Sequence, residues 1–182
     1  PNEFRAAPFW SWNDELELGE IERQLRDFGD KGWGGTFMHA RRGLVTEYMG
    51  KEWMEAISRS VKVGDETGLL TWKYDENTWP SGFGGGAVPK LGTEYRSCAL
   101  VRTSERPDPE THTLFSVYAK DGNYWQQVST ESDDDQALVF ISHAVEPLGM
   151  ERYMGTCDVD RMNQDVISAF LDSTLEPYTN RV

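Results

Sequence analysis

Two neighbouring carboxylates, Asp75 and Glu76, follow a short apolar run and precede Trp79 and a glycine-rich segment. The apolar run, from Leu69 to Tyr74, predicts a buried strand. Carboxylates and aromatic side chains at the carboxyl end of such a strand, followed by glycines, are typical of the places where α/β barrels carry out chemistry. Glycines let a loop backbone approach a ligand closely, because they lack Cβ atoms. The same pattern also fits a strand end that is merely capped by a polar turn.

The two strands predicted earlier in the chain also end in polar or aromatic side chains. The first ends in Trp12 and Asn13, and the second ends in His39 and Arg41, which share a face because side chains alternate along a strand. If the strands are parallel, all three ends meet at one rim, and polar groups that converge there indicate a ligand site. The candidate site therefore comprises Trp12, Asn13, His39, Arg41, Asp75, Glu76 and Trp79.

If Asp75 and Glu76 continue the strand, they cannot together be the acid/base pair of one hydrolytic site, because adjacent residues of a strand face opposite sides, whereas glycosidase carboxylates flank one bond. We expect one of them to face the ligand and the other to be held by Arg41 or by backbone amides. Trp12 and Trp79 would offer apolar platforms to sugar rings. Core packing is the alternative for every tryptophan, and we prefer it for Trp33, Trp53 and Trp72.

Hydrophobic periodicity predicts the elements that position these side chains. Strands are expected over residues 8–13, 36–41 and 69–74, alternating with amphipathic helices over residues 18–28 and 53–61. The strands are uniformly apolar, which implies a parallel sheet covered on both faces. Helix N-caps are expected at Asn13 or Asp14 for the first helix.

The pattern changes from about residue 93 to residue 150, where strand-like runs are separated by turn residues and no helical period occurs. Asp121-Gly122 is a signal for a two-residue hairpin loop. After Met150 the helical period returns, with Asn163 as the expected N-cap. This segment therefore predicts a small antiparallel sheet inserted after the third parallel strand.

We therefore expect an α/β fold that consists of the first three β/α units of a TIM-type barrel and an inserted antiparallel β subdomain. The predicted divisions are residues 1–92 for the barrel units, 93–150 for the insert and 151–182 for the return to the barrel. A small open α/β domain is the alternative, since a closed barrel has eight units. The uncapped end at Val182 and the start at Pro1 favour a piece of a longer polypeptide, so a cytoplasmic and an exported location both stay open.

The net charge of −13 argues against nucleic acid, which needs basic clusters, and it also disfavours anionic membrane surfaces and polyanionic substrates. No window approaches the ~18 uninterrupted apolar residues of a membrane span. Neutral ligands such as sugars fit this charge. Cys98 and Cys157 are expected to be reduced structural thiols. We expect no metal site, because the acidic run at residues 131–135 lacks the spacing of a calcium loop and His39 with Asp75 matches no zinc pattern.

Four stretches carry a resemblance to a known family: PFWSWN, GGTFMHARRGLVTEYMGKEWM, KYDENTWPSGFGGG and VDRMNQDVISAFLDSTLEPY. In this order they resemble the amino-terminal barrel segment of glycoside hydrolase family 106, the α-L-rhamnosidase type. The resemblance implies a (β/α)₈ catalytic domain with β-rich accessory domains, and hydrolysis of O-glycosidic bonds. Rhamnosidases of this family look like inverting enzymes that use glutamates and a calcium ion, and we expect those glutamates on later strands.

The functional expectation is a segment of an α-L-rhamnosidase-like glycoside hydrolase that is inactive on its own. Asp75 and Glu76 are the candidate catalytic carboxylates, and Trp12, Asn13, His39, Arg41 and Trp79 are the candidate substrate-binding residues. The expected partners are a carbohydrate substrate and the missing carboxyl-terminal part of the same polypeptide. This segment requires no cofactor, whereas calcium is compatible with the full-length enzyme.

Two other functions stay open. One is a non-catalytic carbohydrate-binding or scaffold domain that uses the insert as its recognition surface. The other is a metal-dependent barrel enzyme that acts on sugars, such as an isomerase or a deacetylase.

Overall fold

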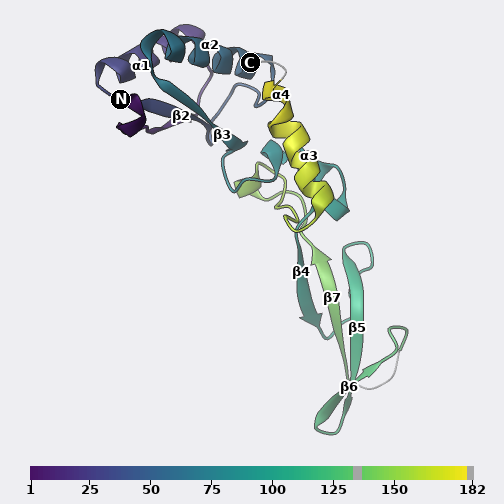
Figure 1. The fold of residues 1–182 in the computed structure, drawn as a ribbon. Helices are drawn as coiled ribbons and strands as arrows, with labels where there is room; N and C mark the ends of the chain where they lie inside the picture. The colour runs from purple at the N-terminus through teal and green to yellow at the C-terminus, as the bar shows by residue number, and fades with distance from the viewer. Residues whose placement is uncertain (133–136, 180–182) are drawn as a thin grey trace.

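The computed structural model describes residues 1–132 and 137–179. Figure 1 shows a parallel sheet with two helices at one end of the molecule and an antiparallel sheet that projects away at the other. The mixed α/β class is thus confirmed, with one parallel and one antiparallel sheet. Of the predicted acidic turn, residues 133–135 lie outside the described residues.

The parallel sheet has the order β1-β2-β3. Its strands are β1 (Phe9–Trp12), β2 (Gly35–Ala40) and β3 (Leu70–Asn77), and α1 (Leu18–Asp30) and α2 (Lys51–Thr67) connect them. The third strand is longer than predicted, because its pairing with β2 continues to Asn77 after an irregularity in register. Asp75 and Glu76 therefore belong to the strand itself and not to the loop behind it.

Both helices pack on the same face of this sheet (Figure 1). Alternation turns Trp10, Trp12 and Met38 toward that face, where they meet the apolar stripes of α1 and α2. Trp53 of α2 lies within this core, with its ring 5.1 Å from Trp12 between centroids. Its indole N–H donates a 2.8 Å hydrogen bond to the hydroxyl of Tyr178, from the last described turn, α4 (Glu176–Thr179).

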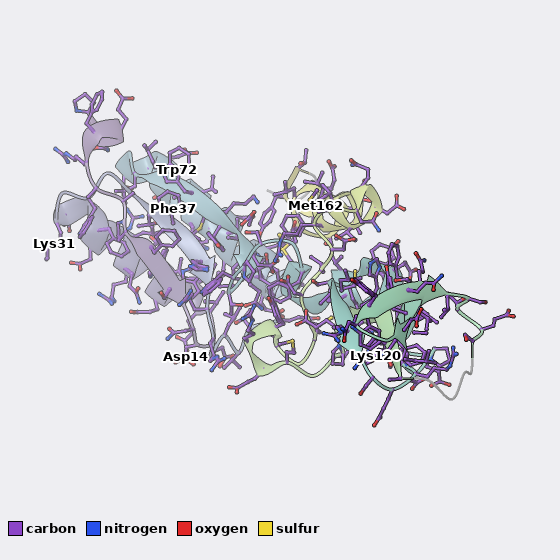
Figure 2. All side chains as sticks on the ribbon, turned by 90° about the horizontal axis from the view of Figure 1, so that it is seen from below. Asp14, Lys31, Phe37, Trp72, Lys120 and Met162 are labelled. Atoms are coloured by element: carbon purple, nitrogen blue, oxygen red, sulfur yellow. The ribbon has the colours of Figure 1, made fainter. Side chains whose placement is uncertain are left out.

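The opposite face of the sheet is aromatic and open to solvent, whereas the sequence predicted cover on both faces. Phe9, Phe37 and Trp72 stack across the three strands, with centroid separations of 5.2 and 5.8 Å. Figure 2 shows Phe37 and Trp72 beside each other on this sheet. Phe9 is 60% exposed and Trp72 is 49% exposed. Trp72 therefore does not have the core position that we expected for it.

The antiparallel sheet has the order β4-β7-β5-β6. Its strands are β4 (Cys98–Thr103), β5 (His112–Asp121), β6 (Tyr124–Val128) and β7 (Leu138–Val145). The predicted hairpin between the second and third of these strands is present. Asp121 pairs with Tyr124, so the two loop residues are Gly122 and Asn123, one position later than predicted.

The helix α3 (Gln164–Thr174) begins at the predicted N-cap, since the Asn163 side chain accepts a 2.9 Å bond from the Asp165 N–H. Val166 and Phe170 on this helix pack against Phe83 and Val88 in a second, smaller core. The first helix begins after Glu17, so the caps predicted at Asn13 or Asp14 are wrong. Short 3₁₀ turns complete the structure: η1 (Asn2–Phe4), η2 (Gly84–Gly86), η3 (Val88–Lys90), η4 (Thr93–Tyr95) and η5 (Glu151–Tyr153).

Among the described residues, every helix is too short or too polar to cross a bilayer.

The hydrogen bond between Trp53 and Tyr178 yields a stability prediction. Tyr178→Phe leaves a buried indole N–H without an acceptor, which costs about 1–3 kcal/mol. We expect denaturant unfolding to show a free energy of unfolding lower by roughly 1–2 kcal/mol. Tyr124→Phe is the matched control, because Tyr124 is exposed on β6, and its effect should stay within about 0.5 kcal/mol. Equal effects of the two changes would contradict this account of the core.

Candidate ligand site at the strand ends

The Glu76 carboxylate is the centre of the loop that follows β3. The side chain is 0% exposed, and its two oxygens accept hydrogen bonds from four backbone N–H groups. The N–H groups of Asn77 and Gly85 bind Oε1 at 2.7 and 2.6 Å, and those of Gly82 and Gly84 bind Oε2 at 3.1 and 2.7 Å. The loop therefore folds around the chain's own carboxylate.

Glycine is required in this loop for conformational reasons. Gly84 and Gly85 have φ values of +58° and +62°, which is the left-handed backbone conformation. Residues that have a Cβ atom adopt this conformation only at a cost in free energy. A Cβ on Gly85 would also lie 2.9 Å from the Tyr48 ring. The sequence indicated that the glycines let the backbone approach a ligand, and in the structure the group they approach is Glu76.

Burial raises the pKa of Glu76 to about 7, while the four donated N–H bonds act in the opposite direction. Its enclosed carboxylate has no open side toward the rim. This placement favours a structural role for Glu76, which holds the loop against the end of the strand. Backbone amides, and not Arg41, are thus the partners of the tethered carboxylate.

Asp75 has a different environment. Its side chain is half-buried and accepts a 2.7 Å hydrogen bond from the Ser81 hydroxyl, across the same loop. Trp79 and Pro80, which are joined by a cis peptide bond, lie between these two residues in the chain. Of the two candidate catalytic carboxylates, Asp75 is the one that the structure leaves partly accessible.

His39 connects the second strand to the loop after the third. Its Nε2 lies 3.0 Å from the carbonyl oxygen of Thr78, and because a carbonyl only accepts, Nε2 carries the proton. The Tyr74 ring packs 4.0 Å from the imidazole between centroids. Burial lowers the pKa of His39, and Arg41 lowers it further, whereas the Thr78 carbonyl and Asp75 act in the opposite direction. His39 is therefore neutral at pH 7.

A cavity of about 260 Å³, here called the rim cavity, lies beside this connection. Trp79 forms part of its wall and is 61% exposed. Thr78 has a φ of +71°, uncommon for a residue with a branched Cβ, and its hydroxyl is buried with no hydrogen-bond partner among the described residues. Strained backbone and unpaired polar groups occur preferentially at functional sites. The rim cavity is lined by Arg41, Arg42, Thr78, Trp79 and Arg152.

The predicted site residues from the first strand lie elsewhere. Trp12 is 3% exposed and packs on the helical face, whereas His39 belongs to the open face. Because the Trp12 indole packs against core side chains, we assign Trp12 to the core. Asn13 is exposed at the end of β1, where it lines a separate cavity of about 550 Å³ with Trp10 and Gln24. The structure thus brings together Arg41 and Trp79, with His39 and Asp75 beside them.

Sequence reasoning missed the other residues of the rim cavity. Arg42 adjoins a predicted residue and could have been included from its position alone. Arg152 follows the antiparallel sheet and lies more than a hundred residues away in the chain, so no local pattern connects it to the rim. Thr78 carries no sequence signal, because its backbone conformation is what makes it unusual.

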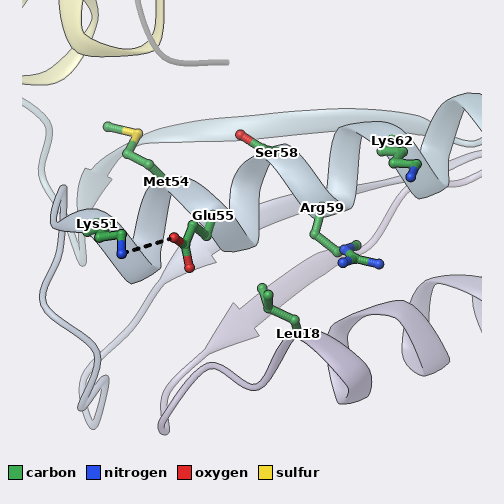
Figure 3. A pocket seen from close by; sticks show the side chains of 7 residues that line it. All are labelled: Leu18, Lys51, Met54, Glu55, Ser58, Arg59 and Lys62. Atoms are coloured by element: carbon green, nitrogen blue, oxygen red, sulfur yellow. Dashed lines mark ion pairs between the residues drawn. The ribbon is translucent and has the colours of Figure 1, made fainter.

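Two further cavities have linings separate from that of the rim cavity. One, of about 330 Å³, is lined by Tyr48, Asn77 and Gly85, and within the described residues the Tyr48 hydroxyl and the Asn77 Oδ1 have no partner. Burial raises the pKa of Tyr48 far above its ordinary value, so the phenol is neutral. The other is a groove of about 580 Å³ on α2 facing Leu18 at the start of α1 (Figure 3). Its polar lining is of mixed charge, with Lys51 and Glu55 3.6 Å apart.

The chain matches no known protein-family model, no curated protein and no solved structure. The resemblance to glycoside hydrolase family 106 therefore stays a prediction. The described side chains include no cluster of three or more histidine, cysteine, aspartate or glutamate residues arranged to hold a metal ion.

The environment of Glu76 predicts how its amide analogue behaves. Glu76→Gln replaces one carboxylate oxygen, which accepts two backbone N–H bonds, by an amide NH₂ group. Since the NH₂ group is itself a donor, two buried backbone N–H groups lose their acceptor. We expect the free energy of unfolding at pH 8, where the carboxylate is ionised, to fall by roughly 2–4 kcal/mol. Denaturant unfolding measures this change, and Glu94→Gln, at an exposed carboxylate, is the control. A change below about 0.5 kcal/mol would contradict the role assigned to Glu76.

The lowered pKa of His39 predicts a pH dependence. In the unfolded chain the imidazole binds a proton near its ordinary pKa of 6.5, whereas the folded protein binds it only at lower pH. The stability that His39 contributes is thus complete above pH 6.5 and is lost as pH falls below it. Unfolding free energies between pH 7.0 and about pH 5.5 should fall more steeply for the wild type than for His39→Asn, which cannot titrate. Parallel curves would contradict the neutral, buried imidazole.

Proposed function

We propose that this chain forms the first three β/α units of a (β/α)₈ glycoside hydrolase of the α-L-rhamnosidase-like type, and that it supplies sugar-binding groups at the rim. The observation that carries this proposal is the asymmetry of the parallel sheet. Its strands follow one another in sequence order, and both connecting helices cover one face. A barrel has its helices outside in this way, whereas doubly wound sheets carry helices on both faces.

The open aromatic face supports the same proposal. In a barrel, the strand face away from the helices lines the interior, where layers of bulky side chains from different strands fill the space. The stacked rings of Phe9, Phe37 and Trp72 form such a row across three strands at one level. We propose that further strands of the same polypeptide cover these rings and complete the barrel.

The rim groups have roles that their environments suit. Trp79 would stack on a sugar ring, because its exposed indole offers an apolar face. Asp75 would accept hydrogen bonds from sugar hydroxyls. His39, through its bond to the Thr78 carbonyl, would fix the distance between the second and third strand ends. The acid that protonates the leaving oxygen, and the base that takes a proton from the attacking water, would come from later strands.

A non-catalytic carbohydrate-binding domain is the second candidate. It is favoured by the enclosure of Glu76, which leaves Asp75 as the accessible member of the predicted carboxylate pair. Exposed aromatic rings on the antiparallel sheet, at Phe115, Tyr124 and Trp125, offer this domain a recognition surface of its own.

Calorimetric titration of the chain with L-rhamnose tests the rim as the sugar site. We expect Trp79→Ala to weaken binding about tenfold or more, because the platform for the sugar ring is lost. Trp125→Ala is the matched control, since Trp125 is another exposed tryptophan and lies on β6. Loss of binding in the control alone would favour the antiparallel sheet as the binding surface. Absence of binding by the wild type to L-rhamnose would contradict both candidates for this sugar.

A further inference from the structure

The rim cavity is lined by three guanidinium groups in a chain whose net charge is −13. Arg41 and Arg42 follow β2, and Arg152 belongs to the turn η5. No carboxylate is among the described residues that line this cavity. Like charges held close together repel, so a cluster of this kind in an acidic protein indicates an anionic partner.

Arg41 is the guanidinium that is free to bind such a partner. Within the described residues, its side chain has neither a hydrogen bond nor an ion pair. Its neighbour Arg42 forms a 3.0 Å ion pair with Glu151, and both side chains of that pair are largely exposed. Exposed ion pairs contribute little and exchange readily with water, so Glu151 neutralises the cavity only in part.

Arg152 is held in place by groups that leave its charge uncompensated at the cavity. Its guanidinium lies 4.6 Å from the ring centroid of Tyr153 and donates a hydrogen bond to the hydroxyl of that residue. The carboxylates that act on it electrostatically have other partners. Asp158 is bound by Arg161 at 2.6 Å, and Glu146 accepts a 3.1 Å bond from the N–H of Asp158.

We propose that the rim cavity binds the anionic substituent of a sugar unit, a carboxylate or a sulfate ester, so that the substrate is an acidic glycan. This inference rests on the proposed function and narrows its substrate class. Guanidinium groups bind carboxylates and other oxyanions through pairs of parallel N–H bonds. Trp79 lies in the same cavity, where its ring can pack on the sugar that carries the charge.

The size of the cavity fits one sugar unit. Its volume of about 260 Å³ is below the ~300–1,000 Å³ that encloses a drug-sized ligand. The overall negative charge opposes the approach of an anion over long distances, but salt screens that repulsion beyond about 8–10 Å. Short contacts with guanidinium groups are therefore the means by which an acidic protein can select an acidic sugar.

The test is calorimetric or NMR titration of the whole chain with D-galacturonate, D-galactose and D-galactose 6-sulfate. We expect galacturonate or the sulfate ester to bind about tenfold more tightly than galactose, the effect of one charge-assisted hydrogen bond. The relative affinity of the two charged sugars identifies the anion. Arg41→Ala should remove most of this preference, because Arg41 lines the cavity and, within the described residues, has no hydrogen bond or ion pair that competes for its guanidinium.

Two further variants make the result specific. Arg41→Lys keeps the charge but loses the paired donors, so it should bind the charged sugar with intermediate affinity. Arg23→Ala removes an equal charge from the exposed surface of α1 and should change no affinity. Equal binding of all three sugars overturns the inference and leaves the proposed function intact. Binding of none of them, together with failure to bind L-rhamnose, overturns both.

Discussion

The buried Glu76 carboxylate is the group on which the rest of the strand-end region depends. A carboxylate without partners inside a protein is strongly unfavourable, and here hydrogen bonds from four backbone N–H groups offset part of the cost of its burial. These bonds fix the backbone from Asn77 to Gly85, the segment that carries Thr78 and Trp79. Gly84 in turn lies against α3, where an added Cβ would be 3.0 Å from the Ser173 hydroxyl. The Glu76 carboxylate thus fixes the loop to the strand end, and this loop packs against α3 at Gly84.

Strand alternation divides the aromatic side chains of the parallel sheet into two layers with different roles. Trp10 and Trp12 face the helices, where edge-to-face contacts with Phe28 and Trp53 build a dry core. Phe9, with Phe37 and His39 from β2, faces away from them. A sheet that buried only one layer would have no need of large rings on its second face. The exposed second layer therefore adds support to the proposal that further strands cover this face of the sheet.

Local sequence patterns predicted the strands and helices, because hydrophobic periodicity reflects which face of a strand or helix is buried. The strands, both long helices and the Asn163 cap follow from such short-range signals. The assignment of Trp12 to the ligand site failed for the opposite reason: a strand-end position does not say which face a side chain occupies. The expectation that the glycine-rich loop admits a ligand was wrong for a similar reason. Glycines indicate that some group lies close to the backbone, but the sequence does not show that this group is Glu76.

The rim cavity could not be predicted because it is assembled by the return of the chain from the antiparallel sheet. Arg152 reaches the rim only after β7 has brought the backbone back, and the ion pair between Arg42 and Glu151 marks the place where the two segments meet. Net charge, by contrast, averages over the whole sequence, and it favoured neutral ligands. Binding depends mainly on the charges close to the ligand. At the rim cavity these are three guanidinium groups, so the local charge is positive although the net charge of the chain is negative. The segment of residues 98–145 therefore forms a sheet of its own and also returns the chain so that Arg152 lines the rim cavity.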